Sequence, residues 1–216
     1  MNLPGYDFFI EVQVRPLLAA ALFTAPDDPQ HPSVRGINLS VQDNTLTLSA
    51  TNRYSIFFYQ ESIITEINDG VRDFEITVPT SLLENIKPAR RGFSDPCIIS
   101  VKGEAPGREI ALQHGESVLY AGEIAYPFPG WRQNIPEAVT NELAFYPHRQ
   151  LRLCARAADI VGRKGKSEPL VFPNGPDRPG VVKFLSAYPC GALLMPTRYK
   201  PEQVPDMDLL RAVKAA

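Results

Sequence analysis

Residues 34–62 read VRGINLSVQDNTLTLSATNRYSIFFYQES. Three runs in this stretch (34–41, 45–52 and 54–62) alternate polar residues with apolar, β-branched or aromatic ones, which is typical of strands. The polar residues QDN at 42–44 separate the first two runs and indicate a turn. The sequence therefore predicts three consecutive strands here.

The same three-strand pattern occurs in three places along the chain, each time after a strand and a helix. The predicted β-α-β-β-β units are, in order, strand 7–14, helix 16–25 and strands 34–41, 45–52 and 54–62; strand 73–79, helix 80–91 and strands 97–103, 108–115 and 117–124; and strand 142–147, helix 148–162 and strands 169–173, 180–187 and 191–198. An internal repeat of one supersecondary unit follows from this order.

Local signals mark the ends of the predicted helices. Thr80 or Ser81 is expected to cap the second helix, with Glu84 completing a capping box and Pro88 limiting its length. Gly162 is expected just past the end of the third helix.

The composition is that of an ordinary globular protein. The chain has 216 residues, 44% of them apolar, with a net charge of −2, which suggests one or two domains. The three cysteines are widely spaced and form no CxxC pair, so we expect no metal site, no cofactor and no disulfide framework, and a reducing cytoplasm as the location. We also expect no signal peptide and no membrane partner, because apolar runs are short and interrupted.

The charges are separated between helices and the rest of the chain. The predicted helical segments 15–25, 81–91 and 148–166 carry ten basic and two acidic residues, whereas the remainder carries 12 basic and 22 acidic residues. In the third helix, helical spacing predicts one basic face, with Arg149, Arg152 and Arg156, and one apolar face, with Leu151, Cys154, Ala155 and Ala158. A cationic face of this kind can contact phosphates or can simply be solvated.

Enzyme chemistry finds little support in the sequence. GRKGKS at 162–167 ends like a phosphate-binding loop, but Ile160 stands where the motif needs its first glycine. No histidine, cysteine or acid pair forms a catalytic constellation, so we expect a protein without catalytic activity. An enzyme on an unrelated α+β fold stays as a minor alternative.

Four stretches in the right order resemble the bacterial DNA polymerase III beta subunit, the beta sliding clamp. RGINLSVQDNTLTLSATNRYSI is similar to the strand-turn-strand of that family with its Ala-Thr-Asp-Gly signature. FEITVPTSLLENI is similar to its strand-Val-Pro-helix step, FPGWRQNIP to its junction between the middle and last domains, and ALLMPTR to its closing strand. The resemblance implies an α+β DNA-clamp fold, with antiparallel sheets outside and helices lining a ring.

The resemblance implies a processivity factor that encircles double-stranded DNA as a homo-oligomer. Its implied partners are a DNA polymerase, other proteins with clamp-binding motifs, and a clamp loader. An alternative is a clamp-derived module that binds replication proteins, or inhibits a clamp, without encircling DNA. The expected DNA-binding residues are Arg15, Lys87, Arg90, Arg91, Arg149, Arg152, Arg156, Arg163, Lys164 and Lys166. The expected partner-peptide pocket comprises Thr51, Tyr54, Ser55, Ile56, Pro129, Arg132, Asn134, Leu193, Met195 and Pro196.

The chain departs from the family in its length. Residues 1–127 resemble the middle domain, 128–136 the junction, and 137–200 only the second half of the last domain, followed by a tail at 201–216. A ring of the family contains twelve such units, which four chains of three units would supply. Three chains, each acting as two domains, would instead imitate a ring of six domains. The remaining option is an assembly that is not a ring.

Three smaller features also carry expectations. Arg53 replaces a family glycine, which predicts backbone strain if the position needs positive φ. Trp131 replaces the junction tyrosine and is expected to wedge the two domains together. In the tail, Met207, Leu209 and Leu210 loosely resemble a clamp-binding peptide and either dock in a groove or pack on their own domain.

Overall fold

The computed structural model describes residues 3–63, 73–89, 94–162 and 168–198. Its elements follow the predicted order except at 80–91 and 142–147. They are, in order, β1 (Phe8–Gln13), α1 (Val14–Ala21), η1 (Pro32–Arg35), β2 (Gly36–Gln42), β3 (Thr45–Thr51), β4 (Ser55–Ser62), β5 (Phe74–Pro79), η2 (Thr80–Leu83), β6 (Pro96–Lys102), β7 (Glu109–His114), β8 (Ser117–Gly122), η3 (Arg132–Asn134), α2 (His148–Val161), β9 (Pro169–Phe172), β10 (Gly180–Phe184) and β11 (Cys190–Leu194), where η marks a 3₁₀ helix. Units 1, 2 and 3 below are residues 8–62, 74–122 and 142–194.

The turn predicted at 42–44 is a two-residue hairpin loop. Gln42 pairs with Thr45 across it, and both loop residues have positive φ, 49° at Asp43 and 58° at Asn44. Two consecutive positive φ values match the right-handed twist of paired strands, and Asp and Asn tolerate them better than most residues. The predicted turn is therefore confirmed.

The strands form two antiparallel sheets. One has the order β1-β6-β7-β8 and the other has the order β5-β2-β3-β4-β11-β10-β9. In each of the first two units the leading strand leaves its own unit, because β1 pairs with β6 and β5 pairs with β2. The strand pair β4–β11 then joins unit 1 to unit 3 in a single sheet.

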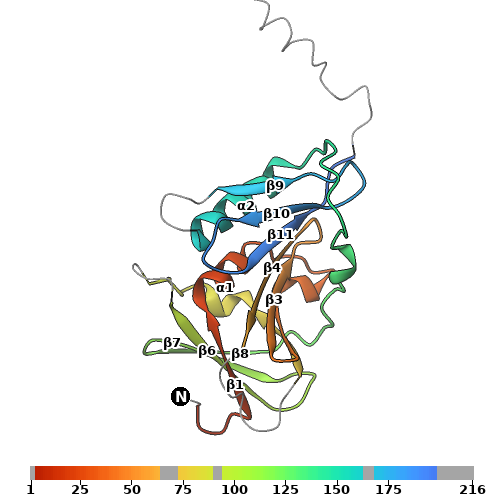
Figure 1. The fold of residues 1–216 in the computed structure, drawn as a ribbon. Helices are drawn as coiled ribbons and strands as arrows, with labels where there is room; N and C mark the ends of the chain where they lie inside the picture. Colours follow the sequence, from red (N-terminus) through yellow and green to blue (C-terminus); the bar gives the residue numbers. More distant parts are fainter. Residues whose placement is uncertain (1–2, 64–72, 90–93, 163–167, 199–216) are drawn as a thin grey trace, which may run out of the picture.

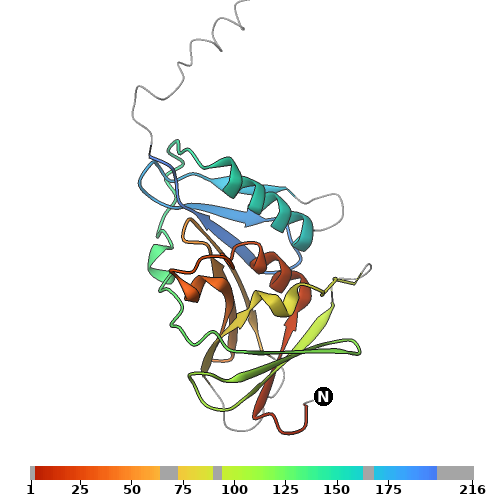
Figure 2. The ribbon, with the colours of Figure 1, turned by 180° about the vertical axis from the view of Figure 1, so that it is seen from behind.

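The helices pack on the buried side of these sheets. α1 contacts β2, β3 and β4, α2 contacts β9 and β10, and the two helices pack against each other; they lie side by side in both views (Figures 1 and 2). One core includes Phe23 beside α1, Phe57 of β4 and Phe184 of β10. Unit 3 therefore shares the core of the rest of the chain.

Two predicted elements are wrong. Residues 142–147 form no strand, and the amides of Gly175 and Thr197 donate to the carbonyls of Glu142 and Phe145 in this segment. The helix predicted over 80–91 is only the four-residue η2, which begins after Pro79 and has no side-chain cap, so neither the Thr80 or Ser81 cap nor the capping box forms. Pro88 and the residue before it disfavour a longer helix.

The third helix is predicted well except at its end and on one face. Gly162 follows α2 directly, but its φ of −69° is extended and not left-handed. Cys154 and Ala158 are buried as predicted, whereas Leu151 and Ala155 are exposed. The buried face centres instead on Gln150, Cys154, Ala157, Ala158 and Val161, because α2 packs against both α1 and the sheet. None of the helices in the described ranges has the length and apolarity required to cross a membrane.

Candidate nucleic-acid and peptide sites

The three arginines predicted on α2 share one exposed face. Arg149, Arg152 and Arg156 are all exposed, and they follow at three- and four-residue intervals on the side of α2 opposite its buried residues. Asp159, one turn further on, is the acidic residue of this helix and is also exposed. The guanidinium groups are therefore available to an anionic partner such as a phosphate backbone.

Arg15 has a different environment from these arginines. Its Nη1 donates to the carbonyl of Ile160 at 2.9 Å and its Nη2 donates to the carbonyl of Ala89 at 3.0 Å. The guanidinium thus joins the start of α1 to the end of α2 and to the chain after η2. These contacts favour a structural role for Arg15 over the predicted contact with DNA.

Of the other cations predicted to bind DNA, only one lies within the described residues. Lys87 is exposed in the chain after η2. Arg90, Arg91, Arg163, Lys164 and Lys166 lie outside the described residues, as does the predicted tail with Met207, Leu209 and Leu210. Among the described cations, the basic surface proposed from the sequence therefore centres on the three arginines of α2.

Trp131 covers the seam at which unit 1 meets unit 3. Its side chain is 4% exposed and packs with Ile56 of β4 and Leu193 of β11, the two strands that form the seam. The indole stacks on Phe58 at a centroid distance of 5.5 Å. The guanidinium of Arg132 lies 5.2 Å from the indole centroid, within range of a cation–π interaction. The tryptophan thus contacts both units that flank the seam.

A cavity of about 290 Å³ lies beside Trp131. Two of the predicted pocket residues, Pro129 and Arg132, line it, together with Asn38, Glu75, Phe128, Gly130, Trp131 and Gln133. Asn38 donates to Glu75 at 2.9 Å across the neighbouring strands β2 and β5. The sequence analysis missed Asn38 and Glu75, although strand alternation could have placed both on one face of the sheet.

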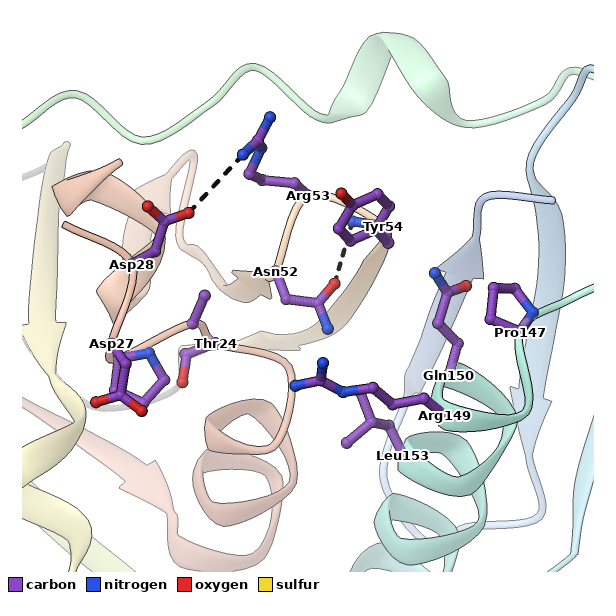
Figure 3. A pocket seen from close by; sticks show the side chains of 12 residues that line it. Thr24, Asp27, Asp28, Asn52, Arg53, Tyr54, Pro147, Arg149, Gln150 and Leu153 are labelled. Atoms are coloured by element: carbon purple, nitrogen blue, oxygen red, sulfur yellow. Dashed lines mark hydrogen bonds and ion pairs between the residues drawn. The ribbon is translucent and has the colours of Figure 1, made fainter. Parts of the chain in front are cut away.

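A larger cavity of about 530 Å³ lies between the chain after α1, the turn between β3 and β4, and the start of α2 (Figure 3). Tyr54 is the predicted pocket residue that lines it. The others are Thr24, Ala25, Pro26, Asp27, Asp28, Asn52, Arg53, Pro147, Arg149, Gln150 and Leu153. Charges of both signs face this hollow, which suits a polar or charged segment of a partner better than a purely apolar one.

The remaining predicted pocket residues line neither of these two cavities. Ile56 and Leu193 are buried beneath Trp131, and Thr51 and Ser55 are buried in the turn between β3 and β4. Asn134 is exposed in η3, and Pro196 is half-buried next to Met195, whose amide donates to the carbonyl of Tyr54 at 2.9 Å. Of the predicted set, Tyr54 lines one cavity and Pro129 and Arg132 line the other.

The turn between β3 and β4 holds Arg53 in a left-handed conformation, with φ of 77°. Asn52 Oδ1 accepts hydrogen bonds from the amides of Tyr54 and Ser55 at 3.1 and 2.9 Å, and Thr51 Oγ1 accepts one from the amide of Arg53 at 3.0 Å. The positive φ on which the expected strain depends is therefore present, and it is a conformation that a residue with a side chain adopts at a cost in free energy. The side chain reaches Asp28 at 3.8 Å across the larger cavity (Figure 3).

Neither cavity contains a thiol nucleophile. Burial raises the pKa of the Cys97 and Cys154 thiols to about 12 and that of Cys190 to about 11, so all three stay protonated at neutral pH. In the described part of the chain, no cluster of three or more His, Cys, Asp or Glu residues could hold a metal ion.

The fold of this chain resembles that of solved structures, although its sequence matches no known family. No protein-family model and no curated protein sequence matches the chain. The solved structures it resembles include the DNA polymerase III subunit beta of Pseudomonas aeruginosa, with a TM-score of 0.66 and 12% identity over 92% of this chain and 69% of that one. They also include the Helicobacter pylori beta clamp bound to a DNA ligase peptide (TM-score 0.63, 12% identity, 92% and 68%) and the beta subunit of Thermotoga maritima (TM-score 0.59, 13% identity, 93% and 68%). The chain therefore has the fold of the bacterial sliding clamps.

Proposed function

We propose that this chain is a sliding-clamp-like processivity factor of DNA replication. In this proposal, several copies encircle duplex DNA in the cytoplasm and tether a DNA polymerase or other proteins that carry clamp-binding motifs. A clamp loader would open the assembly onto DNA. A closed ring stays on long DNA through its topology, so the protein needs neither a catalytic residue nor a cofactor.

The observation that carries the proposal is the exposed arginine face of α2 within a clamp fold. Arg149, Arg152 and Arg156 belong to a helix that packs beside α1 on the side of the sheets that bears the helices. Phosphate contacts need cations without base-specific geometry, as sliding requires. The chain as a whole has a net charge of −2, so this local cationic face is what could attract DNA.

The two cavities beside the β4–β11 seam are the proposed partner site. The cavity lined by Pro129 and Arg132 adjoins Trp131, which packs on the seam residues Ile56 and Leu193. The larger cavity is lined by Tyr54, in the turn that leads into β4, and by Arg149 of α2. The related Helicobacter pylori structure is of a clamp bound to a DNA ligase peptide. A short peptide with apolar and polar side chains is therefore the partner that we propose for this site.

Retention on circular DNA tests the proposal. We expect the oligomer to stay on a circular duplex and to be lost when the circle is cut. Replacing Arg149, Arg152 and Arg156 by Glu should abolish retention while the solution mass of the oligomer stays unchanged. A control with equal charge change outside α2 replaces the exposed cations Lys102, Arg178 and Arg198 by Glu and should retain the protein. Full retention of the α2 variant would refute the DNA-encircling role.

An interaction module that does not encircle DNA is the second candidate. It needs only the cavities near Trp131 and Tyr54 and no closed ring. The chain spans 67–69% of the clamp chains it resembles. This candidate predicts that a clamp-binding peptide binds the seam cavities while circular and linear DNA are retained equally. Binding of the peptide without topological retention would therefore select it.

A further inference from the structure

Of the two arginines that line the larger cavity, one is already paired within the fold and the other is not. Arg53 lies 3.8 Å from the carboxylate of Asp28 and 3.4 Å from Nδ1 of His31. Arg149 takes part in none of the ion pairs between described residues. Its side chain is exposed and points into the hollow from the start of α2 (Figure 3). A carboxylate that enters this cavity would therefore meet an unpaired guanidinium.

The same cavity has an apolar wall beside this guanidinium. Leu153 follows Arg149 by one turn of α2, Pro147 directly precedes the helix, and Tyr54 is 60% exposed. Asp27, in the chain after α1, is exposed and adds a negative charge to the lining. The volume of about 530 Å³ is within the range of ligand pockets. The lining therefore suits a short segment in which acidic and apolar side chains alternate and a basic one follows.

The described chain ends close to this cavity. The amide of Met195 donates at 2.9 Å to the carbonyl of Tyr54, which lines the cavity. Arg198, the last described residue, is only three residues further on. Eight more residues lead to the stretch DMDLL at 206–210, and they span up to about 26–29 Å at about 3.3–3.6 Å per extended residue. This stretch can therefore return to Tyr54 without any change in the described fold.

The stretch at 206–210 matches the lining in charge and in polarity. Its acidic residues, Asp206 and Asp208, alternate with apolar ones, and Arg211 follows directly. The carboxylates are complementary to Arg149, and the cation that follows is complementary to Asp27. The remaining three side chains of the stretch are apolar, as the wall of the cavity requires.

We propose that residues 206–210 bind in the larger cavity of their own chain. A carboxylate of this stretch pairs with Arg149, and its apolar side chains cover Leu153 and the ring of Tyr54. The short tether holds the stretch near the cavity at an effective concentration of the order of mM, so weak contacts are enough. The bound stretch excludes a partner peptide from this cavity and occupies one arginine of the basic face of α2. The inference goes beyond the proposed function, because it requires neither DNA nor a partner protein.

A cysteine pair tests the position of the stretch in the full chain. The double variant Tyr54→Cys and Leu210→Cys should form a disulfide within one chain on mild oxidation, because the two side chains meet in the cavity. Tyr120 provides the matched control, since it is 63% exposed but lies on β8 in the other sheet. The pair Tyr120→Cys and Leu210→Cys should yield several-fold less product, measured by mass analysis of proteolytic fragments. Equal yields for the two pairs, or a disulfide that joins two chains, would overturn the inference.

Hydrogen exchange tests whether the stretch covers the cavity. Leu209→Arg removes an apolar side chain and brings a cation towards Arg149, so it should release the stretch. The amides of residues 24–28 and 52–54 should then exchange several-fold faster than in the unmodified chain. Val213→Arg has the same charge change outside the stretch and should leave the exchange unchanged. Exchange that is equally fast in all three chains would contradict the inference.

Duplex DNA gives a readout that depends on Arg149. Asp206→Asn together with Asp208→Asn should strengthen the binding of a duplex oligonucleotide several-fold, because the arginine becomes available to a phosphate. The same two substitutions should give a clearly smaller gain in the Arg149→Ala background. An equal gain in both backgrounds would mean that the tail repels DNA without occupying Arg149, which overturns the proposed pairing. If none of the chains binds the duplex, the proposed function fails, whereas the intrachain disulfide still supports the inference.

Discussion

The indole ring of Trp131 lies on the phenyl ring of Phe58 with an interplanar angle of 16°. Phe58 belongs to β4, and the same indole packs on Leu193 of β11, so one side chain covers both strands of the seam between unit 1 and unit 3. The segment that carries Trp131 is rich in proline and has η3 as its regular element. A large anchor outside regular structure therefore holds the junction onto the sheet.

Removal of the Trp131 side chain should lower the stability of the fold. Trp131→Ala is expected to lower the free energy of unfolding by about 3–5 kcal/mol, because a buried aromatic is lost and a cavity remains. Trp131→Phe keeps an aromatic ring against Phe58 and should cost clearly less. Urea unfolding followed by circular dichroism measures both variants. Equal costs for the two variants would show that the stacked ring does not hold the seam.

A buried ion pair fixes the chain that leads to the junction. Arg108 donates to Glu123 from Nε at 2.8 Å and from Nη2 at 2.7 Å, and Nη2 also donates to the carbonyl of Glu75. Both side chains are almost fully buried. Arg108→Leu should lower the free energy of unfolding by about 3 kcal/mol, because it leaves the Glu123 carboxylate buried without its partner.

The double variant Arg108→Leu with Glu123→Leu is the control for this ion pair. It should recover most of the lost stability, because neither charge then remains buried. Chemical denaturation of both variants and of the unmodified protein gives the comparison. A double variant as unstable as the single one would mean that packing, and not charge, causes the loss.

Acid should weaken the contact between the loop before β6 and the strand β7. Burial opposes ionisation of Asp95, but hydrogen bonds from His114 at 2.9 Å and from the amide of Ala89 at 2.6 Å outweigh it and hold the pKa of Asp95 below its ordinary value. A depressed carboxyl pKa stabilises the folded state above the unfolded pKa of about 4, and this contribution is lost as the pH falls through the folded value.

Asp95→Asn is the variant that isolates this acid-sensitive contact. The free energy of unfolding of the unmodified protein should fall as the pH drops below about 4, and the variant should show a shallower fall over the same range. Urea titrations at several pH values measure the two slopes. Parallel slopes would assign the acid sensitivity to other carboxylates.

Much of the fold could be predicted from the sequence, because strand alternation and turn chemistry are local signals. Asp43 and Asn44 fix the first hairpin by their backbone preferences alone. Residues 142–147 have the pattern of a strand but are not one in the structure, since a strand depends on pairing with a distant segment that the local sequence does not specify. The local alternation of residues therefore predicted an extended segment but could not predict whether it pairs with another strand.

The candidate site was predicted less completely. The exposure of Arg149, Arg152 and Arg156 follows from helical spacing, whereas Arg15 shares their charge and is bonded to two backbone carbonyls. Asn38 and Gln150 line the cavities although neither was among the predicted pocket residues, since the chain brings them there from different units. Residue type alone does not distinguish an exposed arginine from one whose guanidinium already donates hydrogen bonds to the backbone.

Arg53 offers a direct measure of backbone strain beside the larger cavity. Arg53→Gly should be more stable than Arg53→Ala by about 1 kcal/mol, because alanine keeps the unfavourable left-handed conformation and glycine does not. Both variants lose the contact with Asp28 at 3.8 Å, which is exposed and worth little, so their difference isolates the cost of the conformation. Thermal denaturation of the pair measures it. If the two variants melt together, the turn has relaxed and the position carries no strain.

Substitution of Arg15 should affect stability, whereas substitution of Arg149 should affect DNA binding. Arg15→Ala removes the charged donor from the carbonyls of Ile160 and Ala89, which should lower the free energy of unfolding by about 2 kcal/mol. Arg149→Ala removes an exposed guanidinium at the start of α2 and should change stability by less than about 0.5 kcal/mol. In a salt titration of DNA binding, the slope should decrease for Arg149→Ala and stay unchanged for Arg15→Ala, because only the former would release counterions from phosphates. A reduced slope for Arg15→Ala at a temperature where it is fully folded would instead place that guanidinium on the DNA.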